Sequence, residues 1–176
     1  MILKEARAQF IEMGFQKVSM RSIAKQLGCS HGALYYHFSN KAELFYAIIE
    51  EYFNRLNQLI EEVVNRSAGQ QTKLKNLLLC FIEFGLTHQS QYEMMFMFKN
   101  NEVHTLSQEA ANLSYQRFAQ SVQALSPNKL PISEIYSAFL ALHGFVSHYH
   151  SQVDHFEEAK EAAHIHVNFI IKALTH

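Results

Sequence analysis

Helix-breaking and cross-linking residues are scarce in this sequence of 176 residues, which has two prolines, six glycines, two cysteines and no tryptophan. Scarce proline and glycine favour long helices over a fold with many tight turns. Cys29 and Cys80 are widely separated and lie in apolar sequence. We therefore expect two buried thiols in a reducing cytoplasm, not a disulfide or a metal-binding pair.

Segments that could cross a membrane or direct export are also lacking. The longest uninterrupted apolar run covers residues 77–82, which is far too short for a bilayer. The start of the sequence shows no basic segment followed by an apolar leader. We therefore expect a cytoplasmic protein with no membrane partner.

Patterns that serve catalysis are few. The sequence has no HExxH and no glycine-rich loop of the kind that cradles phosphates, and no pair of carboxylates is expected over a cleft. These patterns supply zinc ligands, nucleotide sites and acid–base pairs in many enzymes. We expect a protein that is not an enzyme and that needs no cofactor.

Charge is unevenly distributed, although the net charge is only −1. Residues 1–45 carry six Lys or Arg against three Glu, whereas residues 46–176 carry nine Lys or Arg against thirteen Asp or Glu. A basic N-terminal part followed by an acidic remainder is typical of a protein that meets an anionic partner at one end.

Apolar residues recur at helical spacing along the whole chain, so we expect an all-α fold of about nine helices. The first helix should stop at Gly14, and the second should run from a Ser19 cap to Gly28. A Ser30 cap should open the third, which ends at Phe38. The other helices are expected at residues 41–65, 72–88, 92–98, 105–125, 132–152 and 156–174.

The stretch GCSHGALYYHF, residues 28–38, carries two histidines and two tyrosines but only two positions suited to a core, Leu34 and Phe38. A helix that ends at a glycine, a tight turn and a second short helix form the helix-turn-helix plan. In that plan the second helix lies in the DNA major groove, with its N-terminal residues at the base edges. The outward polar and aromatic side chains are therefore expected to face DNA.

Four motifs, FIEMGF, SMRSIAKQLG, GALYYHF and NKAELF, occur in this order within residues 1–50. Together they resemble the DNA-binding domain of the TetR family of transcriptional regulators. The resemblance implies a three-helix helix-turn-helix domain over residues 1–45 and a helical regulatory, ligand-binding and dimerisation domain over residues 46–176. Family members usually carry a short basic arm before the first helix, and this sequence begins almost at that helix, so contacts of such an arm with the minor groove stay open.

The resemblance also implies a role for each residue of the DNA-facing set. Phosphate and occasional base contacts are expected from the start of the second helix, base-edge contacts from the start of the third, and backbone or thymine-methyl contacts from its tyrosines. The first turn of the fourth helix would bind a phosphate. In chain order the set is Ser19, Arg21, Ser22, Ser30, His31, Gly32, Ala33, Tyr35, Tyr36, His37 and Lys41.

Residues 80–98 and 139–150 together resemble a TetR subgroup whose regulatory domain carries a Trp-His-Gly element. Leu142 stands where that subgroup has tryptophan, followed by His143 and Gly144, and the smaller side chain would open space in a pocket. The resemblance implies a pocket for a small lipophilic or aromatic effector. Its candidate lining is aromatic and rich in methionine: Phe81, Phe84, His88, Tyr92, Met95, Phe96, Phe98, Phe118, Phe139 and His143.

Aromatic residues at helical spacing also build ordinary cores, and for most of this set that is the simpler interpretation. Gly85 and Gly144 each lie inside an expected helix. A glycine there removes a side chain where another helix or a ligand comes close.

The last expected helix is apolar over two adjacent faces, one with Ala162, Ile165, Phe169 and Ala173 and one with Ala163, Val167, Ile170 and Leu174. So wide an apolar band needs two neighbours, its own domain and a twofold partner. We therefore expect a homodimer in which the last two helices of each chain form a four-helix bundle. A twofold dimer holds its recognition helices roughly 34–36 Å or further apart, so its operator in double-stranded DNA should be palindromic.

Six histidines gather near the end of the chain: His143, His148, His150, His155, His164 and His166. Residues two apart, as in the pairs 148/150 and 164/166, splay across a helix instead of sharing a face. We therefore expect no metal. The sequence predicts a dimeric transcriptional repressor that its effector releases from DNA. Two alternatives stay open: a helical dimer that binds a ligand or protein but no longer DNA, and a histidine-based metal sensor.

Overall fold

The computed structural model describes residues 1–100 and 103–175, apart from the side chains of His104 and Leu106, and over these residues the prediction of an all-α fold is confirmed. The elements in chain order are α1 (Ile2–Met13), α2 (Met20–Leu27), α3 (His31–His37), α4 (Lys41–Val64), α5 (Gln70–Thr87), α6 (Gln89–Tyr92), η1 (Glu93–Met97), α7 (His104–Leu125), α8 (Ile132–Tyr149) and α9 (Phe156–Thr175). None of the described helices has the combination of length and apolar character that crossing a bilayer requires.

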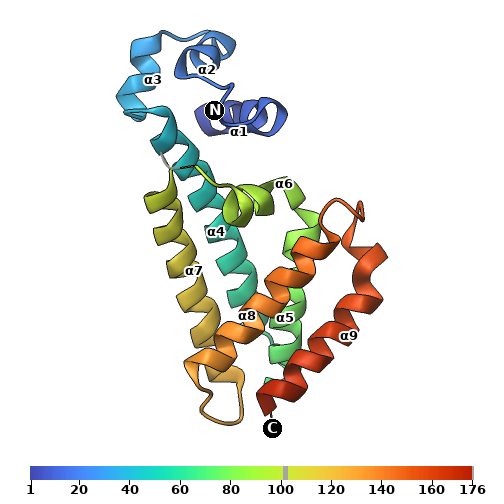
Figure 1. Cartoon of the computed structure of the whole chain (residues 1–176). Coiled ribbons are helices and arrows are strands. Elements are labelled where there is room, and N and C mark those ends of the chain that lie inside the picture. The colour runs from blue at the N-terminus through green and yellow to red at the C-terminus, as the bar shows by residue number, and fades with distance from the viewer. Residues whose placement is uncertain (101–102, 176) are drawn as a thin grey trace.

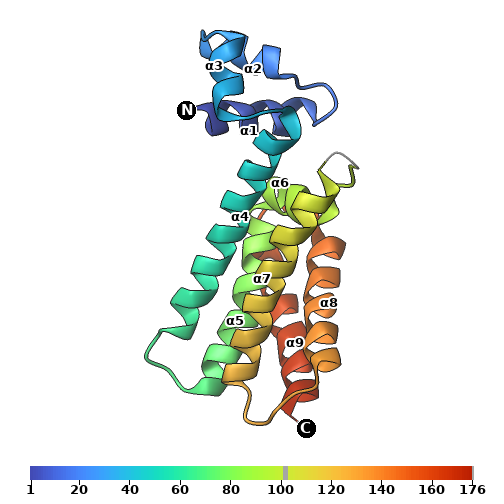
Figure 2. The ribbon, with the colours of Figure 1, turned by 90° about the vertical axis from the view of Figure 1, so that its left-hand side faces the viewer.

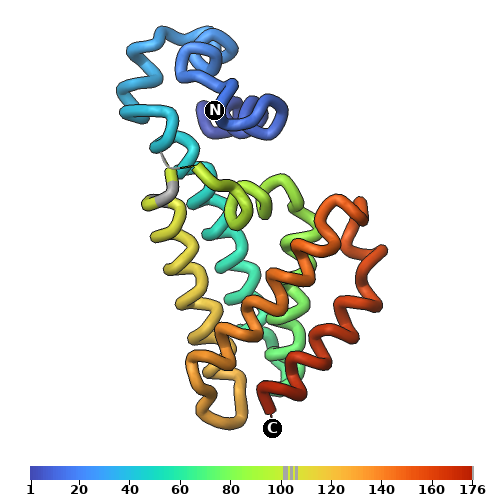
Figure 3. Tube along the Cα trace, in the orientation of Figure 1, coloured from blue at the N-terminus to red at the C-terminus, as the bar shows by residue number. Residues whose placement is uncertain are grey.

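Helices α1, α2 and α3 form a small head at one end of the molecule (Figure 1). Helix α4 starts in the head and continues down the body, where it packs along α7 (Figures 1 and 2). Helix α5 runs through the body between α4 and α9, and α8 packs on both α5 and α9. The tube in Figure 3 places the N-terminus in the head and the C-terminus at the far end of the body. The predicted domain boundary at residues 45/46 falls inside α4, which head and body share.

Two expected helices end differently in the structure. In place of the expected helix over 92–98, the short α6 begins at Gln89 and continues into one turn of π-helix, η1, which ends at Met97. The wide π turn closes through a 2.9 Å bond from the Phe98 N–H to the Glu93 carbonyl. Helix α8 ends at Tyr149, before the expected residue 152, because Ser151 adopts a left-handed backbone with φ 65° and turns the chain.

The head has its own aromatic core. The rings of Phe10, Phe15 and Phe45 lie 5.0–5.7 Å apart, centroid to centroid, which is the usual spacing of packed aromatic pairs. Leu34 of α3 is also fully buried. Phe45 belongs to α4, so the first turns of α4 are part of the head's core.

The prediction of two buried thiols is wrong in degree, because Cys29 and Cys80 are free but only partly buried. Cys80 faces a trough between helices, so part of its surface stays open. Its surroundings are still apolar enough that burial raises the pKa of the Cys80 thiol to about 11.

Gly85 marks a close approach of α5 and α8. A Cβ at this position would lie 2.6 Å from Val146 Cγ1 and 3.1 Å from Tyr92 Cδ2. The predicted close neighbour of Gly85 is therefore another helix. Gly144, by contrast, has nothing within 4 Å of its Cβ position among the described residues and is exposed.

Replacing Gly85 by alanine is expected to destabilise the protein by about 1–3 kcal/mol, because a methyl group there overpacks the contact with Val146. Urea unfolding followed by circular dichroism measures the effect. Gly32→Ala is the matched control, since nothing lies within 4 Å of its Cβ position. It should stabilise α3 by up to about 1 kcal/mol. Equal effects of the two substitutions would contradict the close approach at Gly85.

Candidate nucleic-acid interface and regulatory core

The turn between α2 and α3 forms as the residues predict. Ser19 and Ser22 make a reciprocal capping box at the start of α2, with N–H to Oγ distances of 3.0 and 3.1 Å. Gly28 ends α2 in the left-handed conformation with φ 65°, which glycine adopts without a Cβ clash. Ser30 then caps α3 by accepting a 3.1 Å bond from the Ala33 N–H.

Helix α3 buries one side chain and exposes the rest. Leu34 is completely buried and Phe38 half-buried, whereas Tyr36 is 86% exposed. The rings of His31 and Tyr35 contact each other edge to face at 4.8 Å, and those of Tyr36 and His37 do so at 5.2 Å. The exposed residues of this segment are Ser30, His31, Gly32, Ala33, Tyr35, Tyr36 and His37. We call them the Tyr-His surface; helix α3, which carries most of it, lies at the end of the molecule formed by the head (Figures 1 and 2).

A shallow hollow on the head brings several predicted DNA-facing residues together. Its lining comes from the start of α2, from α3 and from the start of α4: Val18, Ser19, Met20, Arg21, His31, Tyr35, Asn40 and Lys41. The structure thus places residues from three separate segments around one depression. Ser22 is not among the lining residues, and its hydroxyl donates to the Gln9 side chain at 2.9 Å.

Lys41 has a second role that the sequence did not reveal. Its ammonium donates a 2.9 Å hydrogen bond to the Phe15 carbonyl and lies 4.1 Å from the centre of the Phe15 ring. A lysine over an aromatic face gains a cation–π attraction. The contact fixes the Lys41 ammonium at the edge of the hollow, and its phosphate-binding role stays a prediction.

Residues 28–32 also match GxSxG, the nucleophile pattern of α/β-hydrolases. That nucleophile stands on a turn between a strand and a helix. Ser30 instead follows α2 and uses its Oγ to cap α3. The match therefore lacks the geometry of a hydrolase nucleophile.

Six of the predicted effector-binding residues do gather in the body. Phe81 lies 5.5–6.1 Å from its neighbours in this group, and Phe139 and His143 have nearly parallel rings 6.5 Å apart. We call the group the aromatic core; its members are Phe81, Tyr92, Phe96, Phe118, Phe139 and His143. Met95 is buried on the same turn as Phe96.

The other three predicted residues lie elsewhere. Phe84 and His88 pair with each other at 5.2 Å and line a trough of about 440 Å³ between α4, α5 and α9. Charged residues of α4 and α9, among them Arg55 and Lys160, form its walls. Phe98 lies in the head, against Phe15 and Phe45. Helical spacing alone could not distinguish these three residues from those of the aromatic core, because the place of each side chain depends on which helix packs against its face.

A buried hydrogen bond crosses the aromatic core. The Tyr92 hydroxyl lies 2.6 Å from His143 Nδ1. Burial raises the pKa of Tyr92 well above its usual value and lowers the pKa of His143. Both groups are therefore neutral near pH 7, and the hydroxyl and the imidazole share one hydrogen bond.

Protonation of His143 should oppose folding. Its pKa is lowered in the folded state, so below about pH 6.5 the unfolded chain binds a proton that the folded chain resists. The free energy of unfolding is therefore at its full value above that pH and decreases as the pH falls below it. Chemical unfolding at pH 7.5 and pH 5.0 should show a larger loss for the natural protein than for His143→Gln, and equal losses would contradict this account.

The C-terminal histidines do not converge. The Nε2–H of His166 donates to the Ala141 carbonyl at 3.0 Å, and His150 pairs with Ser151 at 2.9 Å. Within residues 1–100 and 103–175, no three His, Cys, Asp or Glu side chains are placed to hold a metal ion together.

Helix α9 buries one of its two predicted apolar faces. Ala163, Val167, Ile170 and Leu174 lie in the core of the body. On the other face, Ile165 is 65% and Phe169 is 69% exposed. Helix α8 adds further exposed apolar residues: Ile132, Tyr136 and Leu140. A single chain thus leaves a large apolar surface on these two helices in contact with solvent.

The geometry of the head is that of a helix-turn-helix protein. Residues 2–48 match the family described as "Bacterial regulatory proteins, tetR family". The transcriptional activator FasR of Mycolicibacterium smegmatis is 28% identical over 113 residues, which cover 64% of this chain and 50% of FasR. The chain spans about half the length of the curated relatives it matches.

Solved structures share the whole fold. A TetR/AcrR-family regulator from Aquifex aeolicus superposes with a TM-score of 0.74 at 22% identity, over 96% of both chains. FadR of Bacillus subtilis, in complex with stearoyl-CoA, gives 0.72 at 16% identity, over 99% of this chain and 96% of FadR. The TetR-family match covers the head, as the N-terminal motifs predict, and the fold of the whole chain is that of the TetR/AcrR-family regulator from Aquifex aeolicus. Members of the family are transcriptional regulators and not enzymes.

Proposed function

We propose that this chain is a dimeric, effector-responsive transcriptional repressor of the cytoplasm that binds a palindromic operator in double-stranded DNA. One observation carries the proposal: the Tyr-His surface is exposed on a short helix that needs only Leu34 and part of Phe38 for its own packing. Aromatic and imidazole side chains so exposed suit contacts with base edges, thymine methyl groups and the sugar-phosphate backbone.

The head offers both kinds of contact that a DNA-binding protein uses. Arg21 and Lys41 both line the hollow as candidate phosphate partners, and Asn40 caps α4 there by accepting a 2.8 Å bond from the Glu43 N–H. Phosphate contacts fix the register of a protein on the duplex. His31 at the start of α3 is then placed to distinguish bases.

The second copy of the chain is proposed to cover the exposed apolar face of α8 and α9. Ile165 and Phe169 are the largest exposed apolar side chains of α9, and burying each would contribute about 1.5–3 kcal/mol. The exposed Gly144 of α8 would let a helix of the partner approach closely. A twofold axis at this face that runs along the length of the molecule would point both heads to the same side, as a palindromic site requires.

The aromatic core is proposed as the effector site. It combines apolar rings with one polar pair, Tyr92 and His143, and this is the usual character of a small-molecule site. The FadR structure shows an acyl-CoA in a protein of the same fold. The aromatic lining here favours a compact lipophilic or aromatic effector.

Effector binding is proposed to weaken operator binding. A coupling of about 1–3 kcal/mol between the two sites changes affinity by about 5–150-fold, which is enough for a switch. Release of a dimer that otherwise occupies its operator gives repression as the output.

Selection from a random-sequence duplex library with the purified protein tests the proposal. We expect enrichment of one palindrome whose half-sites are spaced by about one helical turn or more. A chain that has lost DNA binding would enrich no sequence, and that result would favour a helical binding module. Enrichment of a single, non-repeated site would contradict the twofold dimer.

A further inference from the structure

One turn of the chain contributes rings to two aromatic groups of the hydrophobic core, one in the body and one in the head. Phe96 of η1 lies 4.7 Å from Tyr92, 5.7 Å from His143 and 6.3 Å from Phe139, inside the aromatic core of the body. Phe98, two residues later, lies 4.9 Å from Phe45 and 5.6 Å from Phe15, in the core of the head. A displacement of one ring is therefore expected to move the other ring.

The backbone that carries both rings is unusual. Residues 93–97 form a π-helical turn, closed by the bond from the Phe98 N–H to the Glu93 carbonyl. A π turn is rare and is found frequently at functional positions. Here it allows Phe96 and Phe98 to point into different cores.

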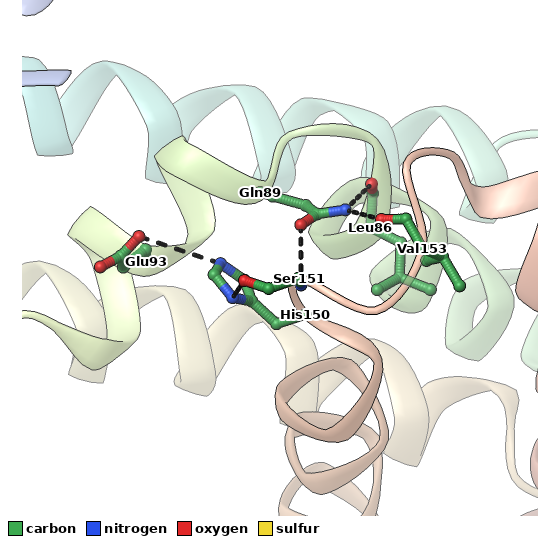
Figure 4. A network of polar contacts seen from close by, with 6 residues as sticks. All are labelled: Leu86, Gln89, Glu93, His150, Ser151 and Val153. Carbon is green, nitrogen blue, oxygen red and sulfur yellow. Dashed lines mark hydrogen bonds and ion pairs between the residues drawn. The ribbon is translucent and has the colours of Figure 1, made fainter. Parts of the chain in front are cut away.

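The start of this segment is fixed to the body. Gln89 of α6 bonds the loop between α8 and α9 through its side-chain amide: its Nε2 donates to the Val153 carbonyl at 2.7 Å, and its Oε1 accepts from the Ser151 N–H at 3.1 Å (Figure 4). The same Nε2 also donates to the Leu86 carbonyl of α5 at 3.4 Å. His150 of the same loop faces Glu93 of η1 at 3.9 Å (Figure 4). The segment is thus held at its start and can transmit movement at its end.

On the head side, the contact leads directly to the hollow. Phe15 receives Phe98 on its ring, and its carbonyl and ring also hold the Lys41 ammonium. Moving Phe98 would therefore disturb the position of Lys41 and of the loop before α2.

We propose that Phe98 is a positioning residue that couples the aromatic core directly to the DNA-binding head through η1. The coupling runs through side-chain contacts that include Phe45 and Phe53 of α4, and it does not require α4 to bend. The regulatory role of this coupling rests on the proposed function. An effector that displaces Phe96 withdraws Phe98 from Phe15 and Phe45, and the head loses the support that fixes its orientation.

Amide hydrogen exchange on a double-mutant cycle tests the coupling without DNA or effector. When a segment recloses faster than its exposed amides exchange, the exchange rate reports the equilibrium between the closed and open forms of that segment. The ratio of the rates in a variant and in the natural protein then gives the change in that equilibrium. Phe96→Leu should speed exchange in head peptides around Phe15 and Phe45 by about threefold to tenfold when Phe98 is present. In a Phe98→Ala background the same substitution should leave those rates within about 1.5-fold, because the connection is cut. Phe98→Met replaces Phe98→Ala if the head unfolds.

Phe145→Leu is the matched control. Phe145 packs on Tyr149 and His166, at 4.6 and 5.0 Å, and belongs to neither core. It should leave the head peptides unchanged in both backgrounds. Equal acceleration by Phe96→Leu with and without Phe98 would overturn the proposal, as would no acceleration at all. Either result is independent of whether the protein selects an operator, so failure here is distinct from failure of the proposed function.

Discussion

Phe169→Glu is expected to convert the dimer into monomers and to remove detectable operator binding. Phe169 is 69% exposed on α9 in the single chain, so the substitution should leave the monomer folded. In a twofold interface the change occurs twice. Loss of a buried aromatic anchor costs about 2 kcal/mol or more, so the dimer should weaken by about three orders of magnitude or more when the buried charges are included.

Sedimentation velocity at micromolar concentration measures this change, with circular dichroism to verify that helix content is retained. Lys160→Gln is the control: it alters the net charge by the same amount, and Lys160 lies nine residues from Phe169, which places it on the opposite face of α9. Lys160 lines the trough between α4, α5 and α9, so this variant should stay dimeric. A dimeric Phe169→Glu would show that the two chains meet at another surface.

His31→Ala and Arg21→Ala should weaken operator binding in different ways. His31 stands in the first turn of α3 and is exposed. If it contacts a base edge, its removal costs about 1–3 kcal/mol at each half-site and relaxes the preference at particular positions. Arg21, exposed at the start of α2, should instead bind a phosphate. Arg21→Ala should weaken binding on all sequences alike and flatten the log–log salt slope by about 0.9 for each phosphate that the variant no longer neutralises.

Fluorescence anisotropy against the selected palindrome, single-base variants of it and unrelated duplexes separates the two effects. Gln26→Ala supplies the control, because Gln26 is exposed on α2 outside the predicted set. It should change neither affinity nor salt slope. If His31→Ala and Arg21→Ala lowered affinity evenly on every sequence, the division between base-reading and positioning residues would be wrong.

The head could be predicted from sequence because its determinants are local. Ser19, Gly28 and Ser30 act through capping and backbone conformation within a few residues, and Leu34 follows from the spacing of a single helix. Local rules of this kind do not depend on which helix packs where. The exposure of the Tyr-His surface follows from the same argument.

For the regulatory part, the sequence predicted which residue types gather there but not where each side chain lies. The sequence indicated an aromatic set but could not show that Phe84 and His88 face a trough, or that Phe98 enters the head. Gly85 and Gly144 have the same sequence signal, yet Gly85 meets Val146 and Gly144 lies open. Such differences arise from tertiary packing. The contact of Lys41 with Phe15, 26 residues away, and the π turn at η1 are of the same kind.

We expect the Tyr-His surface to dock on a DNA duplex. Fluorine NMR of protein labelled with 3-fluorotyrosine tests it directly, because the eight tyrosines include two on α3 and several in the body. Tyr35→Phe and Tyr36→Phe assign the two α3 signals. On addition of the selected palindrome, the signals of Tyr35 and Tyr36 should shift and broaden while those of buried Tyr92 and distant Tyr149 stay in place. A bound duplex that leaves both α3 signals unchanged would contradict the account.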